Sequence, residues 1–311
     1  MTQKQDYYSI KDRVSNSSLS YLKQSPMHFK AFLDGDLDKD TNPMNFGRYL
    51  HEKVLEPHKV DKRWAVKQDG RTKVGKAANT EALEAGLQLI SQDEADKAKD
   101  MAESLNKCDT LDYHLNFFRK NTLLEHEIFF EMEGVPCKSK LDMVVKGKFV
   151  LDLKTAVSAK PEEFKRKATF AYDYDRQAAF YKAAAEAAGL WEEGMKFYFL
   201  AVEKEPPYAW SLIEVDDTIL KRGERKYKEL LELYKECKAK NEWPGYGASL
   251  WEDETEREMT FEATPVSAAD ISMSEMMQML GMPQKSNNVA YTKPRYRLSK
   301  KMGEWVATHI N

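Results

Sequence analysis

Apolar and polar residues follow a strand-like pattern between residues 137 and 154, and this pattern predicts a β-hairpin. The runs Cys137–Val145 and Phe149–Lys154 are rich in apolar and β-branched side chains, and Lys146-Gly147-Lys148 separates them. Three-residue hairpin loops commonly contain a glycine because one loop position needs a positive φ. A hairpin centred on Gly147 pairs residues that lie equally far from it along the chain.

This pairing gives the two faces of the hairpin different characters, because successive side chains point to opposite sides of a strand. One face is apolar and is predicted to be core; it carries Leu141, Met143, Val145, Phe149, Leu151 and Leu153. The other face sets Asp142 opposite Asp152, and it sets Lys140 opposite Lys154.

The opposed carboxylates of Asp142 and Asp152 indicate a cation site. Directly opposed side chains lie about 5 Å apart at Cβ, and two like charges at that distance destabilise a hairpin. A hard divalent ion such as Mg²⁺ binds carboxylate and carbonyl oxygens and would neutralise the pair. The alternative is a solvated face whose charges happen to align, but Val144 and Val150 on the same face favour partial burial.

The remaining hydrophobic periodicity predicts helices and strands on both sides of the hairpin. Start signals such as Ser15 and Ser91, and stop signals such as Pro57 and Gly189, bound the helical segments. We expect helices at residues 15–25, from 27 onward, at 45–56, as two helices within 76–105, at 175–188 and at 217–241. We expect further strands at 127–132, 195–202 and 210–215. This mixture predicts an α/β fold.

Length and composition are those of a soluble protein with one large domain, with or without appendages. The chain has 311 residues, of which 42% are hydrophobic, and it contains no run of about 18 apolar residues. The N-terminus lacks the apolar core of a signal peptide. Cys108, Cys137 and Cys237 are scattered without a CxxC motif, so neither a zinc site nor a disulfide framework is indicated. A reducing cytosol fits best.

The charge distribution restricts how the chain could bind nucleic acid. The net charge is −3, so binding would depend on a local basic patch. The stretch Lys59–Lys76 holds seven basic and two acidic residues, and Arg71, Lys73 and Lys76 are candidate DNA-binding residues within it. An ordinary solvated loop is the alternative interpretation.

The composition changes after the sequence Trp243-Pro244-Gly245-Tyr246. We therefore predict one domain over residues 1–247 and a loosely attached tail over 248–311. Within the tail, Ile271–Met282 reads as a short methionine-rich helix, and methionine suits adaptable docking surfaces. This helix could equally pack on a core of its own.

Several motifs occur in the order found in one nuclease superfamily. Asp142 on one strand, then Asp152-Leu153-Lys154 on the next, followed by an alanine-rich helix, resembles the core of the PD-(D/E)XK nucleases. Gln177 and Tyr181 resemble the QxxxY motif, and their i, i+4 spacing puts both on one helix face. A lone histidine beside an apolar stripe is usually structural, but the stretch around His51 is similar to the family's metal-binding N-terminal helix.

The resemblance implies a fold and a set of roles. The expected fold is a mixed central sheet flanked by helices, with further helices at the N-terminus. Asp142, Asp152, the Leu153 carbonyl and His51 would hold Mg²⁺, with Mn²⁺ as a substitute. Lys154 would orient or deprotonate the attacking water, and Gln177 and Tyr181 would fix the scissile phosphate or the lysine. Some branches of the family use an additional glutamate, for which Glu127 and Glu131 are the candidates.

Together with the N-terminal stretch SNSSLSYLKQSPMHFK and the sequence WPGY at Trp243, these motifs make roughly residues 9–246 similar to the nuclease domain of RecE-like exonucleases, also known as exodeoxyribonuclease VIII. This resemblance implies a cytoplasmic enzyme of bacterial or phage-infected cells that degrades linear double-stranded DNA from its ends, 5′ to 3′. It also implies a ring-shaped homo-oligomer, a trimer or tetramer, that passes 3′ single strands to an annealing protein during phage-type recombination or repair. The alternatives are an endonuclease, a helicase-associated nuclease, or a catalytically silent DNA-end-binding protein.

Overall fold

The computed structural model describes residues 7–37, 42–112, 121–247, 295–301 and 304–310. The chain divides into two compact units, Met1–Ala248 and Ser249–Asn311. The division lies one residue from the predicted boundary after residue 247. The roles assigned to the two parts stay predictions.

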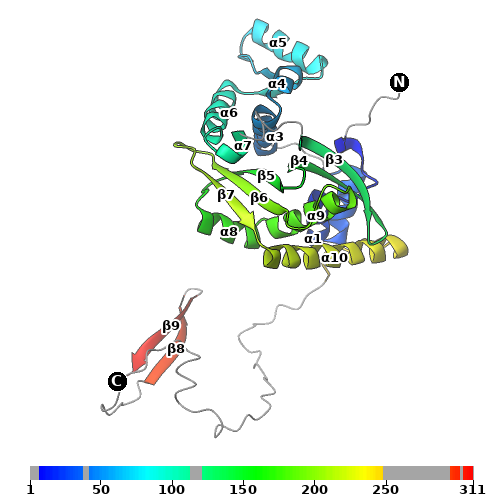
Figure 1. Cartoon of the computed structure of the whole chain (residues 1–311), viewed down its shortest axis with the longest axis vertical. Coiled ribbons are helices and arrows are strands. Elements are labelled where there is room, and N and C mark those ends of the chain that lie inside the picture. The colour runs from blue at the N-terminus through cyan, green and yellow to red at the C-terminus, as the bar shows by residue number, and fades with distance from the viewer. Residues whose placement is uncertain (1–6, 38–41, 113–120, 248–294, 302–303, 311) are drawn as a thin grey trace. The chain divides into compact units, whose positions relative to one another are not determined.

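A five-stranded sheet forms the centre of the first unit (Figure 1). Its strands, in spatial order, are β3 (Thr122–Met132), β4 (Val135–Val145), β5 (Phe149–Ala156), β6 (Lys196–Glu203) and β7 (Trp210–Val215). β5 and β6 run parallel, whereas the other neighbouring strands run antiparallel. The predicted mixed central sheet is therefore confirmed.

Two tight turns set the register of the first three strands. β4 and β5 pair Val145 with Phe149 across a three-residue loop, whose Gly147 has a φ of +71°. β3 and β4 meet at Glu133-Gly134, where both residues have positive φ, as a two-residue type I′ hairpin requires. The hairpin centred on Gly147 is the one predicted from the sequence pattern.

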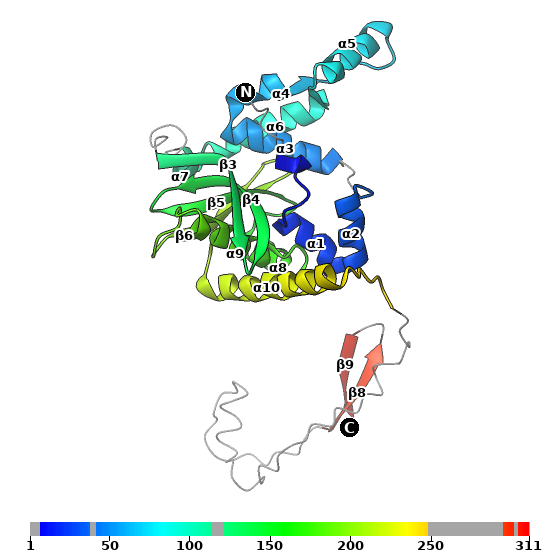
Figure 2. The same ribbon diagram turned by 90° about the vertical axis from the view of Figure 1, so that its right-hand side faces the viewer.

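Helices cover both faces of this sheet (Figures 1 and 2). One face is covered by α1 (Asn16–Gln24), α2 (Pro26–Asp34), α8 (Pro161–Phe170), α9 (Tyr174–Ala187) and α10 (Asp217–Lys240). The other is covered by α3 (Asn42–Leu55), α4 (Pro57–Arg63) and α6 (Gln92–Leu105). α5 (Lys73–Glu84), α7 (Asp109–Asp112) and a short 3₁₀ helix at Tyr7–Ser9 complete the helices of the described residues. The two layers enclose two separate apolar clusters.

The helix starts follow the capping signals in the sequence. Ser15 and Ser91 cap α1 and α6, and each forms a reciprocal capping box with the third residue of its helix. Ser25 caps α2, and Pro26 occupies the first helical position, where the missing N–H costs nothing. Pro57 follows the end of α3 as expected, and it also begins α4.

The predicted faces of the hairpin are correct near the turn and wrong at Leu141. Met143, Val145, Phe149, Leu151 and Leu153 belong to the apolar cluster under α3 and α6. Leu141 instead belongs to the cluster under α1 and α9, together with Val144 and Val150. The alternation of β4 is therefore interrupted between 141 and 143, at Asp142.

Some small elements were not predicted. β1 (Trp64–Val66) and β2 (Gln88–Ile90) form a parallel pair beside α5. In the second unit, β8 (Arg295–Lys301) and β9 (Glu304–Ile310) form an antiparallel hairpin where only a tail was expected. The predicted methionine-rich helix at Ile271–Met282 lies outside the described residues. Within the described residues, no helix combines the length and apolar character needed to cross a membrane.

Candidate active site

The site lies where β4 and β5 stop pairing. Their ladder ends at the pair Met143–Leu151, one residue before Asp142 would meet Asp152. Beyond this point the Leu153 N–H donates to Asp142 Oδ2 over 2.8 Å. The predicted direct opposition of Asp142 and Asp152 across the two strands is therefore wrong. The Leu153 N–H bonds the Asp142 carboxylate instead of a backbone carbonyl of β4.

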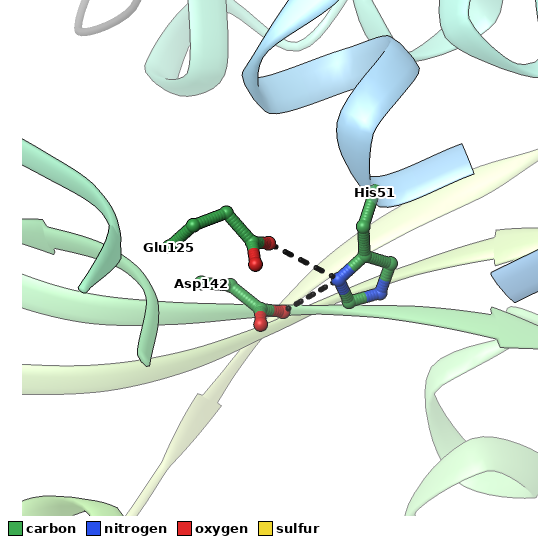
Figure 3. Close-up of side chains that lie close together, drawn as sticks. All are labelled: His51, Glu125 and Asp142. Atoms are coloured by element: carbon green, nitrogen blue, oxygen red, sulfur yellow. Dashed lines mark ion pairs between the residues drawn. The ribbon is translucent and has the colours of Figure 1, made fainter. Parts of the chain in front are cut away.

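Two carboxylates and one imidazole converge at this point (Figure 3). His51 of α3 places Nδ1 3.4 Å from Asp142 Oδ2 and 3.8 Å from Glu125 Oε1. One ligand atom from each residue lies within 4.8 Å of those of the other two, which suits a single metal ion. Elements from three different parts of the chain, α3, β3 and β4, supply this group.

The backbone at Glu125 has an unusual conformation. Its φ is +47°, in the left-handed region that non-glycine residues rarely adopt. The β3–β4 ladder pairs Leu124 with Met143 and His126 with Leu141 and omits Glu125. Such strain is typical of functional sites, where the surrounding structure holds a side chain in a required direction. Here that direction leads to His51 and Asp142.

Asp152 and Lys154 form an ion pair beside this group. Lys154 Nζ lies 2.5 Å from Asp152 Oδ2, and the carboxylate of Asp152 is 1% exposed. Gln177 of α9 donates from Nε2 to Asp152 Oδ1 over 3.1 Å. One turn along α9, Tyr181 lies close enough to hydrogen-bond Gln177. The helix spacing of the QxxxY motif therefore brings Gln177 to Asp152 and Tyr181 to Gln177.

The close packing of charges shifts several pKa values. Burial raises the pKa of Asp152 to about 6, and the charge of Asp142 adds to this effect. Burial also acts to lower the pKa of His51, but Asp142 and Glu125 raise it to about 10. For Lys154, burial is outweighed by Asp152, Tyr174 and Asp142, so its pKa lies above the ordinary value. The cations His51, Lys154 and Lys140 thus balance part of the negative charge.

The donor set fits a divalent metal ion. Glu125 Oε1 is buried and has no hydrogen-bond donor; His51 lies 3.8 Å from it, and Lys140 contacts the other oxygen of the same carboxylate. A carboxylate oxygen left without a donor is costly to bury unless a cation binds it. Two carboxylates and one imidazole around a single point suit Mg²⁺ or Mn²⁺. The chemistry of the residues therefore agrees with the metal that the motif implies.

A pocket of about 430 Å³ opens beside the metal-binding group. It is lined by Glu125 and Lys140 and by Glu56, Lys59, Arg63, Leu124, His126, Glu127 and Phe129. Lys140 Nζ contacts Glu125 Oε2 over 2.5 Å, rather than facing Lys154 as the hairpin pattern predicted. Lys59 and Arg63 bring the first part of the basic stretch 59–76 to this pocket.

The predicted DNA-binding residues lie elsewhere. Lys73 and Lys76 belong to the first turn of α5, and Arg71 precedes this helix and pairs with Asp69. Figures 1 and 2 both show α5 beyond α4, on the side away from the central sheet. The structure therefore does not bring these three residues to the acidic group.

Glu125 is the site residue that the sequence analysis missed. Glu127 and Glu131 were considered instead, and neither belongs to the metal-binding group. The signal was present in the Glu133-Gly134 turn, because counting outward from a two-residue turn there sets Glu125 opposite Asp142. The sequence pattern predicts this strand only from residue 127, so Glu125 falls outside the predicted β3 and has no predicted partner on β4.

Comparisons with known proteins agree with this geometry. Residues 15–251 match the family model described as a PDDEXK-like domain of unknown function (DUF3799). A crystal structure from Eubacterium rectale, named as a candidate exonuclease, has a TM-score of 0.52 at 17% identity, covering 80% of this chain and 96% of that one. It supports the fold.

Other comparisons add less. An alkaline exonuclease from Laribacter hongkongensis has a TM-score of 0.30 at 13% identity, over 76% of this chain and 94% of that one, which is too low to support an argument. No curated protein gave a significant match. The family model spans most of the chain and confirms the resemblance drawn from Asp142, Asp152 and Lys154. The chain therefore belongs to the PDDEXK-like family.

Proposed function

We propose that this chain is a metal-dependent deoxyribonuclease that degrades linear double-stranded DNA from its ends. The observation that carries this proposal is the convergence of His51, Glu125 and Asp142 next to the buried Asp152–Lys154 pair. Three carboxylates, an imidazole and an amine at the splayed end of a hairpin have no evident structural use. They match the requirements of phosphodiester hydrolysis.

The residues divide the work between holding an ion and handling the phosphate. His51, Glu125, Asp142 and Asp152 would hold Mg²⁺ or Mn²⁺, and the Leu153 carbonyl lies in the same stretch of β5. When bound, the ion would supply Lewis-acid activation and neutralise charge that builds up on the phosphate. Gln177 fixes the orientation of Asp152 by donating to Oδ1.

Lys154 is best suited to stabilise charge. Its amine is held 2.5 Å from Asp152 and 4.9 Å from the ring centroid of Tyr174, so both neighbours favour the ammonium form. An ammonium can donate to a phosphate oxygen or orient water, whereas it cannot accept a proton. Lys154 is therefore better suited to orient the attacking water and to stabilise negative charge than to take a proton from that water.

Replacing Lys154 should separate catalysis from binding. We expect Lys154→Gln to lower kcat about 10²- to 10³-fold, as removing one donor from a developing negative charge usually does. The dissociation constant for duplex DNA should change only a few-fold, because the buried amine contributes little to the surface that binds the rest of the duplex. Single-turnover cleavage and fluorescence anisotropy in EDTA measure the two quantities.

Finer details of the proposal rest on the resemblance to RecE-like exonucleases. The exonuclease name of the Eubacterium rectale structure is consistent with this branch. We extend the proposal to 5′ to 3′ polarity, to a ring-shaped homo-oligomer and to a role in producing 3′ single strands for an annealing partner. Arg71, Lys73 and Lys76 would then contact DNA outside the site.

A comparison of DNA forms tests the proposed function. The purified chain is incubated with linear and with covalently closed circular duplex, in Mg²⁺, Mn²⁺ or EDTA. Metal-dependent loss of the linear form alone supports the exonuclease, and labels at the 5′ and 3′ ends then reveal the polarity. Nicked circles would indicate an endonuclease instead. Binding without cleavage of either form would contradict the proposal and indicate a silent DNA-binding protein.

A further inference from the structure

The connection between β5 and α9 exposes large aromatic side chains close to the proposed site. Phe170, the last residue of α8, is 84% exposed, and Tyr172 is 55% exposed. The same helix buries Phe164 and Ala168 in the core. The exposed rings therefore do not serve the packing of α8 in the described structure.

These rings are connected to Lys154 through one further aromatic side chain. Tyr172 stacks on Tyr174, with ring centroids 5.3 Å apart and an angle of 28° between the ring planes. Tyr174 in turn lies beside Lys154, whose Nζ is 4.9 Å from its ring centroid. One ring thus separates the exposed surface from the amine assigned to the scissile phosphate.

Basic side chains lie next to the exposed rings. Arg166 and Lys167 precede Phe170 by four and three positions, a spacing that puts side chains on the same side of a helix. In the part of the chain that the structure describes, no salt bridge involves Lys165, Arg166 or Lys167. These cations are therefore available to bind phosphate groups.

We propose that residues 165–174 form a platform on which unpaired bases of the cleaved DNA strand stack. This inference rests on the proposed nuclease function and deepens it. Flat aromatic rings combined with cations are the features by which proteins bind single strands without sequence preference. Protein-binding surfaces also use aromatic rings, but the direct link to Lys154 favours a nucleic-acid strand.

The burial of the site explains why such a platform is needed. Asp152 is 1% exposed, so a separated strand end fits this buried site better than intact duplex does. Leaving the duplex breaks base stacking, which has to be replaced for the open form to accumulate. Phe170 and Tyr172 would offer new stacking partners to the terminal bases within reach of Lys154.

The test measures single-strand binding under conditions that prevent cleavage. A 5′-phosphorylated oligonucleotide with 2-aminopurine as its terminal base is titrated with the protein in EDTA, and base fluorescence and anisotropy are recorded. The platform variant is the double substitution Phe170→Ala and Tyr172→Ala. The conservative variant is Phe170→Tyr with Tyr172→Phe. The matched control is Tyr246→Ala, because Tyr246 is 74% exposed but faces His28 of α2.

Wild type, the conservative variant and the control should quench the terminal base and bind with similar affinity. The platform variant should bind about 10-fold or more weakly and lose the quenching, because base stacking on protein rings contributes strongly to single-strand affinity. Its melting temperature should stay unchanged, since both side chains are exposed. Quenching and affinity equal to wild type in the platform variant would overturn the inference.

A substrate without bases tests whether the platform variant has a catalytic defect in addition to a binding defect. Hydrolysis of bis(p-nitrophenyl) phosphate in Mn²⁺ should be the same in wild type and the platform variant, while degradation of linear duplex should slow in the variant. If the wild-type protein quenches the base but never degrades DNA, the platform inference is supported and the proposed function is refuted. Degradation by wild type with no effect of the platform variant on binding or quenching would refute the platform alone.

Discussion

Two groups of buried charges in this molecule use the same kinds of residues for different purposes. The group proposed to be catalytic, called the catalytic group below, comprises His51, Glu125, Asp142, Asp152 and Lys154. The α9 charge network comprises Lys23, Asp173, Asp175, Arg176, Arg222 and Lys226. Each group contains two aspartates that are less than 10% exposed. Burial and charge alone therefore do not distinguish them.

Every carboxylate oxygen of the α9 charge network has a donor. Asp173 accepts from Lys226 over 2.8 Å and from Lys23 over 2.5 Å. Asp175 accepts from Arg222 over 2.6 Å, from Lys226 over 3.0 Å and from its neighbouring backbone N–H. The cations outnumber the two carboxylates, so no oxygen is left for a metal ion.

The catalytic group is less fully paired. His51, Lys140 and Lys154 face its three carboxylates, whereas four cations face the two carboxylates of the α9 charge network, and Glu125 Oε1 has no donor. Burial and the charge of Asp142 raise the pKa of Asp152 to about 6. Unsatisfied acceptors and mutual repulsion are the features that a bound cation would relieve. Saturation of the acceptors, and not their burial, separates the structural group from the reactive one.

The α9 charge network supports the site indirectly. Arg176 donates to Asn16 and Ser20 of α1, over 3.0 and 2.7 Å, and lies directly before Gln177. Asp175 binds Arg222 and Lys226 of α10. The network thus joins α1, α9 and α10, and it fixes the helix that presents Gln177 to Asp152.

The largest expected effect is on catalysis by the catalytic group. Asp142→Asn should lower metal-dependent cleavage about 10³-fold or more, because it removes charge from the ion-binding group. The fold should persist, since the asparagine oxygen can still accept from the Leu153 N–H. Cleavage rates on linear duplex and circular dichroism check both points. An active Asp142→Asn protein would show that this carboxylate is not part of the site.

A substitution in the α9 charge network should affect stability instead. Asp175→Asn leaves Arg222 and Lys226 without their buried partner and should cost about 3–5 kcal/mol of unfolding free energy. Urea denaturation measures this loss. Asp69→Asn is the control, because Asp69 pairs with Arg71 in an exposed loop and its loss should have no measurable effect.

The contact between α9 and α10 offers a smaller test. A Cβ at Gly223 would lie 1.9 Å from the Asp175 carbonyl oxygen, so Gly223→Ala forces the helices apart. We expect a loss of about 1–3 kcal/mol in unfolding free energy. Gly47→Ala on α3 is the matched control, since a Cβ there meets nothing within 4 Å and alanine favours the helix. Equal stability of the two variants would refute the close approach.

The last effect concerns pH. A carboxyl whose pKa is raised on folding stabilises the folded state at low pH and loses this contribution as pH rises. For Asp152, raised to about 6, the loss should occur between about pH 4 and pH 6. In EDTA, the stability of Asp152→Asn relative to wild type should therefore rise by about 3 kcal/mol across this range. Thermal melts of both proteins at several pH values measure the difference, and a constant difference would contradict the raised pKa.

The sequence was sufficient for the elements whose signals are local. Capping residues such as Ser15 and Ser91, the Gly147 turn and the helical spacing of Gln177 and Tyr181 depend on neighbouring residues only. The order of the motifs then identified the family. These features predicted the mixed sheet and most of the residues that the structure brings together.

Features that depend on distant contacts escaped prediction. Glu125 reaches the site because two hairpins share β4, and the irregular backbone at 125 and 142 moves Leu141 to the other face. The α9 charge network joins residues as far apart as Lys23 and Asp173, and no local pattern indicates such a pair. Strands of three residues, such as β1, are too short to show periodicity.

The most direct test compares Asp152→Asn with Asp175→Asn, since the two aspartates are 1% and 2% exposed. Cleavage of linear duplex in Mn²⁺ is measured per folded molecule, below the melting temperature of both variants. We predict that Asp152→Asn folds but shows no cleavage above the EDTA background. Asp175→Asn should be less stable and still cleave DNA. Retention of metal-dependent cleavage by Asp152→Asn would contradict the assignment of this group as the active site.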